Sequence, residues 1–160
     1  MKLHQSILVS AIVIVVASSC GAVTNSTVPS ISTPDIGFDV QNETYLKIFA
    51  PDGWNSFKTD DSITLDIQNI SNMQITADPD FGARIFVLTD DEWIEVKNKT
   101  VYKNKPFTID PLKLGALIVR PELPDYSITT KVRVFVVGTL IENGKESKEV
   151  ASYIDLTLNP

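Results

Sequence analysis

Apolar and polar residues alternate along most of the chain after residue 44. In residues 62–69, Ile63, Leu65 and Ile67 fall on one side of an extended chain, and polar residues fall on the other. This period of two predicts a strand with one buried face. Similar stretches predict further strands at residues 44–50, 83–89, 92–98, 106–109, 115–120, 130–141 and 149–158.

Turn residues separate these stretches. Pro51, Asp52 and Gly53 follow the first strand, and Asn143-Gly144 lies between the last two, where it favours a type I′ hairpin. No amphipathic helix is evident between the strands. The pattern predicts an all-β fold, an antiparallel β-sandwich of seven to eight strands spanning residues 44–160.

The N-terminal part of the chain has a different pattern. Residues 7–17 form an uncharged apolar run behind Lys2, and small residues then lead to Cys20. A membrane-spanning helix needs about 20 apolar residues, so this run fits the core of a secretory signal better. We therefore expect a signal peptide at residues 1–19. Residues 20–43 are rich in Ser, Thr and Pro and predict a flexible tether.

The sequence around Cys20 resembles the lipobox of bacterial lipoproteins, in which small residues precede a cysteine that is acylated and becomes the mature N-terminus. That family usually has Leu three positions before the cysteine, where this chain has Ala17. The resemblance implies lipidation of Cys20, a membrane partner reached through that lipid, and an extracytoplasmic location. Simple secretion is the alternative, because Ala17 and Ser19 also suit ordinary signal peptidase cleavage.

The stretch FKTDDSITLDIQNISNMQI, residues 57–75, is similar to the opening of extracellular Ig-like domains of bacterial surface proteins. The whole chain resembles small bacterial lipoproteins that carry one such domain. The resemblance implies an Ig-like sandwich. The Cys–Trp–Cys core of antibody domains is absent, because Cys20 is the only cysteine.

The amino-acid composition excludes several classes of catalytic site and disfavours one class of partner. The only histidine, His4, lies in the predicted signal peptide, which leaves the domain without a Ser–His–Asp or Cys–His arrangement. No glycine-rich phosphate loop is present, and we expect no cofactor and no enzymatic activity. The formal net charge of −6 disfavours nucleic acid as a partner.

Three aromatic residues are candidate contacts for a ligand or partner. Trp54 follows the Pro51–Gly53 turn, and it either closes one end of the core or offers its ring to a sugar or a protein. Trp93 opens a predicted strand and suits the core or a sheet face. Tyr102 lies in a loop.

Acidic pairs in predicted turns are weak candidates for calcium ligands, Asp78 and Asp80 first among them. Aspartate is also a common turn residue, and the spacing of a calcium-binding loop is absent.

These observations favour a membrane-anchored binding module of the cell envelope, with an envelope protein or a polysaccharide as partner. The alternatives are an accessory subunit of an envelope complex, a carbohydrate-binding module that uses loop aromatics, and a proteinase inhibitor with a protruding loop.

Overall fold

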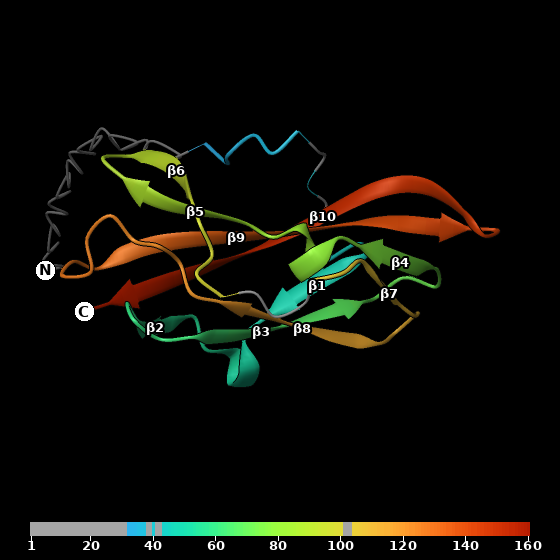
Figure 1. Cartoon of the computed structure of the whole chain (residues 1–160), viewed down its shortest axis with the longest axis horizontal. Coiled ribbons are helices and arrows are strands. Elements are labelled where there is room, and N and C mark those ends of the chain that lie inside the picture. Colours follow the sequence, from blue (N-terminus) through green and yellow to red (C-terminus); the bar gives the residue numbers. More distant parts are fainter. Residues whose placement is uncertain (1–31, 38–39, 41–42, 101–103) are drawn as a thin grey trace, which may run out of the picture. The chain divides into compact units, whose positions relative to one another are not determined.

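The computed structural model describes residues 32–37, 40, 43–100 and 104–160, and this part of the chain is built from β-strands and their connections (Figure 1). Its ten strands are β1 (Leu46–Phe49), β2 (Ser56–Lys58), β3 (Ile63–Asn69), β4 (Gln74–Ala77), β5 (Arg84–Thr89), β6 (Glu92–Val96), β7 (Phe107–Ile109), β8 (Leu114–Val119), β9 (Thr130–Glu142) and β10 (Lys145–Asn159). Two 3-10 turns, η1 (Pro51–Gly53) and η2 (Pro79–Gly82), interrupt them. The all-β prediction is confirmed.

The strands form two sheets. The smaller sheet has the order β1-β3-β8, and the larger one has the order β2-β10-β9-β4-β7, with β5 pairing with both β9 and β6. Figure 1 shows the smaller sheet lying against one side of the β9–β10 ribbon. The inner faces of both sheets supply one apolar core, to which β3 contributes Ile63, Leu65 and Ile67. Packing of the sandwich type therefore holds the domain together.

Two strands of the structure lie outside the stretches that the sequence predicts. They are β2 and β4, with three and four residues. One of them also changes the predicted topology, because β2 pairs with β10 in parallel. The sandwich is thus antiparallel except at this edge and at an isolated parallel bridge between Val40 and Ala151.

The predicted hairpin at Asn143-Gly144 is confirmed. Both residues have positive φ, 53° and 75°, as a type I′ turn requires. Glu142 pairs with Lys145 directly across it. The hairpin fixes the register of the two longest strands, β9 and β10, which are central members of the larger sheet.

A six-residue excursion separates β4 from β5, although both pair antiparallel with β9. Within it, Phe81 adopts a φ of 61° and is nevertheless fully buried. Its ring lies against the backbone of Gly115 in β8, where an added Cβ would come within 2.5 Å of Phe81 Cζ. This six-residue connection therefore places the Phe81 ring between the two sheets. Burial of the ring offsets the unfavourable backbone conformation of Phe81.

The outer face of the larger sheet is partly covered by residues 32–37 and 40, here called the N-terminal segment (Figure 1). Ile36 is only 5% exposed and packs with Phe86, Phe135 and Ala151. Thr33 accepts a hydrogen bond from Arg133 Nη1 over 3.1 Å. This segment belongs to the predicted tether, so part of that tether packs on the domain.

The predicted signal peptide and Cys20 lie outside the described residues. Within the part that the structure describes, no helix has both the length and the apolar character needed to cross a bilayer.

Candidate functional site

Trp54 is the most exposed tryptophan of the described part, with 64% of its surface accessible. It follows η1, where Asp52 and Gly53 have φ values of 59° and 70°. The Trp54 amide donates to Pro51 O over 3.3 Å, which closes the turn directly before the side chain. The tight turn presents the ring to solvent between a buried Ala50 and the edge strand β2. Of the two alternatives that the sequence leaves open for Trp54, the exposed ring excludes the one in which it closes the core.

A surface hollow of about 400 Å³ lies beside this ring. Its other walls come from β2 and from the end of β10, because the parallel pairing sets Ser56 opposite Thr157 and Lys58 opposite Asn159. The lining residues are Trp54, Ser56, Phe57, Lys58, Asp61, Asn159 and Pro160. Here "Trp54 hollow" denotes this set of residues. The Trp54 ring, uncharged polar side chains and one charged side chain of each sign, Lys58 and Asp61, thus line the same small hollow.

Hydrogen bonds fix the polar wall of the Trp54 hollow. Asn159 Nδ2 donates to Ser56 Oγ over 2.8 Å, and Thr129 Oγ1 donates to Asn159 Oδ1 over 3.2 Å. The Lys58 amide donates to Asp61 Oδ2 over 3.0 Å. The wall is therefore oriented before any ligand arrives, which lowers the entropic cost of binding.

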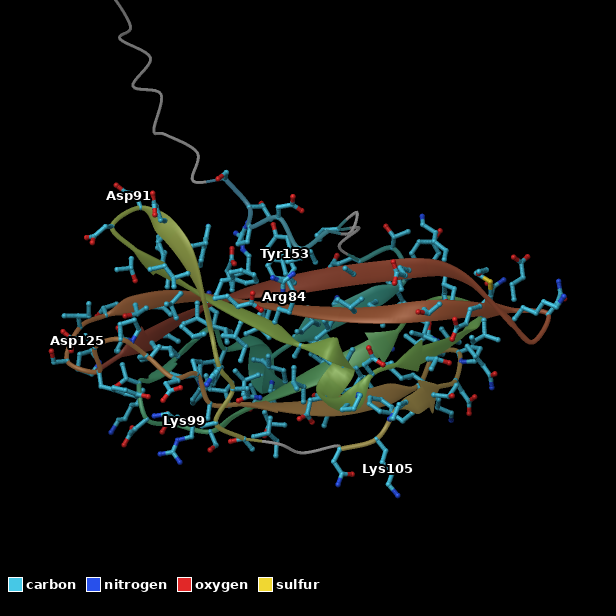
Figure 2. All side chains as sticks on the ribbon, turned by 45° about the horizontal axis from the view of Figure 1, so that its top comes forward. Arg84, Asp91, Lys99, Lys105, Asp125 and Tyr153 are labelled. Carbon is cyan, nitrogen blue, oxygen red and sulfur yellow. The ribbon has the colours of Figure 1, made fainter. Side chains whose placement is uncertain are left out.

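Tyr126 lies on a neighbouring loop. Thr59, the residue after β2, donates through Oγ1 to Tyr126 O over 3.1 Å and through its amide to Asn159 O over 2.7 Å. Lys99 Nζ donates to Tyr126 Oη over 2.6 Å, and this hydrogen bond holds the pKa of Tyr126 below its ordinary value. Figure 2 shows Lys99 and Asp125 at the same end of the domain. The backbone of Tyr126 is therefore joined to the residue that follows β2, whereas its phenol is engaged with Lys99, and the sequence analysis did not select this residue.

Trp93 occupies a different place, on β6 at the outer face of the larger sheet. The Arg133 guanidinium lies 4.9 Å from its ring centre and 4.2 Å from that of Tyr153. Arg133 also forms two hydrogen bonds with Asp155, over 2.6 and 2.7 Å. The sheet-face interpretation of Trp93 is confirmed. Its ring is half-buried and already engaged, which makes it a poorer platform for a ligand than Trp54.

A second arginine pairs on the same face. Arg84 donates to both carboxylate oxygens of Glu95, over 2.8 and 2.6 Å, and to Ile36 O over 3.2 Å. The hydrogen bond from Arg84 holds the pKa of Glu95 below its ordinary value. The outer face shown around Arg84 and Tyr153 in Figure 2 is therefore paired internally and covered by the N-terminal segment.

Asp78 and Asp80 shape the η2 turn through their backbone. Asp78 O accepts from the Phe81 amide over 3.0 Å, and Asp80 O accepts from the Ala83 amide over 3.1 Å. Among the described residues, no three His, Cys, Asp or Glu side chains gather closely enough to hold a metal ion. The predicted ligand contact Tyr102 lies outside the described residues, as does the lipidation candidate Cys20.

Solved structures of distant similarity to this chain include the two described below. No protein-family model and no curated protein matches the chain. The chaperone DraB from E. coli is similar with 20% identity and a TM-score of 0.43, over 76% of this chain and 58% of DraB. The sporulation control protein Spo0M from Bacillus subtilis is similar with 9% identity and a TM-score of 0.39, over 72% of this chain and 49% of Spo0M. This chain therefore spans about half the length of each.

Proposed function

We propose that this protein is a lipid-anchored, extracytoplasmic binding module. In this proposal, Cys20 carries the lipid, and a non-enzymatic Ig-like sandwich recognises a component of the cell envelope through the Trp54 hollow. The observation that carries the binding role is the exposure of Trp54, 64%, on a turn whose neighbours are held in place. A large aromatic ring left in water beside ordered polar groups is typical of a recognition surface.

The geometry favours the Trp54 hollow over the other candidates. Trp93 is stacked on Arg133, and the face around it is covered by Ile36. Leu112 is also exposed, at 70%, but it stands in the turn before β8 and does not line the Trp54 hollow. The Trp54 end combines an exposed ring with a concave polar wall.

The anchoring half of the proposal is tested on the full chain expressed in a bacterial host. We expect intact-mass analysis to find a mature N-terminus at Cys20 with added acyl mass, and membrane fractions to retain the protein. The Cys20→Ser variant loses both properties, because a hydroxyl cannot form the thioether of the lipid. An unmodified Cys20 in the wild-type protein would refute the anchor.

The binding half is tested with the lipidated full chain in nanodiscs, mixed with insoluble envelope material that has been washed free of membrane lipid. We expect co-sedimentation of the wild-type protein and its loss in Trp54→Ala. Leu112→Ala is the matched control, since it removes an exposed apolar side chain elsewhere. Equal sedimentation of the wild-type protein and Trp54→Ala would overturn this half.

A further inference from the structure

We infer that the Trp54 hollow binds a segment of a neutral glycan. This inference rests on the proposed function, since it names the chemical class of the partner for the same site. The first support is the ring itself, because its exposed face is flat, apolar and able to stack on the C–H face of a sugar.

The polar wall matches the hydroxyl groups of a sugar. The Asn159 amide donates one of its two hydrogens to Ser56 and has the second available, and the Ser56 hydroxyl can still donate. The Lys58 ammonium and the Asp61 carboxylate, also in the wall, supply a donor and an acceptor. Sugar hydroxyls both donate and accept, so they can satisfy such a mixed set.

The charges of the hollow favour a neutral ligand. Lys58 and Asp61 contribute one charge of each sign, so these two side chains together offer no net positive charge to a polyanion. The full chain carries a formal charge of −6, which repels acidic polymers at longer range. A nucleic acid or a teichoic-type polyphosphate is therefore disfavoured relative to an uncharged saccharide.

The shape of the site also separates a glycan from a peptide. A peptide that adds a strand to the sheet needs a long free edge, and the adjoining edge strand β2 has only three residues. The hollow, at about 400 Å³, is within the range of sites for small ligands, about 300–1,000 Å³. A short saccharide segment fits this combination of a small hollow and a single platform.

The test is a titration of the full chain in nanodiscs with two neutral probes, cellohexaose and chitohexaose, followed by calorimetry and by fluorescence. The chain has two tryptophans, so the Trp93→Phe variant reports on Trp54 alone. We expect at least one probe to bind saturably and to change the Trp54 emission. Trp54→Ala weakens that binding at least about tenfold, as truncation of a central aromatic contact does.

Controls keep the result interpretable if one variant folds poorly. Trp54→Phe retains a ring and is expected to keep most of the affinity, and Ile128→Ala removes an exposed apolar side chain outside the lining and leaves binding unchanged. Absence of saturable binding by both probes up to their solubility limit would overturn the glycan assignment. So would binding that Trp54→Ala leaves intact.

The glycan assignment and the proposed function fail in different ways. If sedimentation with envelope material depends on Trp54 but is abolished by protease treatment of that material, the partner is a protein, and only the glycan assignment fails. If sedimentation does not depend on Trp54, both the glycan assignment and the binding half of the proposed function fail.

Discussion

Replacing Ile36 with alanine tests whether the N-terminal segment is an integral part of the folded domain. Ile36 is 5% exposed and packs on Phe86, Phe135 and Ala151 across the outer face of the larger sheet. The substitution removes three buried carbon atoms, each worth about 0.8 kcal/mol on transfer from water. We therefore expect the free energy of unfolding to fall by about 2–3 kcal/mol, since a cavity adds to the transfer term and relaxation of the segment reduces it.

The assay is urea denaturation of the full chain in detergent, followed by circular dichroism in the β-sheet region. A lower midpoint with an unchanged slope reports a true loss of stability. Ile128→Ala is the matched control, because Ile128 is 54% exposed and its truncation changes stability by less than about 0.5 kcal/mol. Equal midpoints for Ile36→Ala and Ile128→Ala would refute the docking of the segment.

Three further predictions concern single contacts. Gly138→Ala lowers the free energy of unfolding by about 1–3 kcal/mol in urea denaturation, because the new methyl group would lie 2.5 Å from a buried isoleucine of β4. Glu95→Gln removes a pH-dependent contribution of less than about 1 kcal/mol, since the pair with Arg84 lies at the surface. The pKa of Glu95 is lowered in the folded state, so this contribution is present above the unfolded value of about 4.3 and disappears as pH falls through the folded value. Denaturation midpoints of the wild-type and Glu95→Gln proteins therefore converge in acid, and a constant gap would contradict the assignment. Lys99→Met raises the pKa of Tyr126, which ultraviolet titration of the phenol measures; an unchanged titration would show that Lys99 does not act on it.

The sequence predicts the strands well where alternation is long. All eight predicted stretches overlap a strand of the structure, and the Asn143-Gly144 turn has the expected conformation. The alternation of apolar and polar residues does not predict β2 and β4, which have three and four residues. Their strand conformation depends on the neighbouring strands more than on their own sequence. Their positions are set by pairing with β10 and β9, which local alternation does not encode.

The sequence of β9 contains an indication that another segment covers the outer face of the larger sheet. The alternation of apolar and polar residues does not by itself reveal it. The inner face of β9 has Val132, Val134 and Val136, but the outer face holds Phe135, which is fully buried. An apolar residue among charged ones on the solvent side indicates that something covers it. The covering segment has a Ser/Thr/Pro-rich composition typical of linkers, so its docking follows from tertiary contacts at Ile36.

The two tryptophans show why the sequence could name candidate contact residues but could not decide between them. Each follows a turn and precedes alternating residues, so the local sequence does not separate them. In the structure, cross-strand neighbours surround Trp93 with Arg133 and Tyr153, whereas Trp54 precedes the edge strand β2 and has a hollow beside it. The difference lies in residues that are distant in the sequence, Asn159 above all, which is 105 positions away from Trp54.

The docked segment also limits how far a lipid anchor at Cys20 would let the domain reach. The prediction of a tether over residues 20–43 allows the domain to move away from the membrane over the whole of that length. Within the described residues, the N-terminal segment contacts the sheet from Thr33, thirteen residues after Cys20, and a chain of that length spans at most about 45 Å in any conformation. A binding module anchored in this way would sample only partners close to the membrane surface. Releasing the segment, as Ile36→Ala favours, would extend that range, so the contact that stabilises the outer face would also set the working distance of the Trp54 hollow.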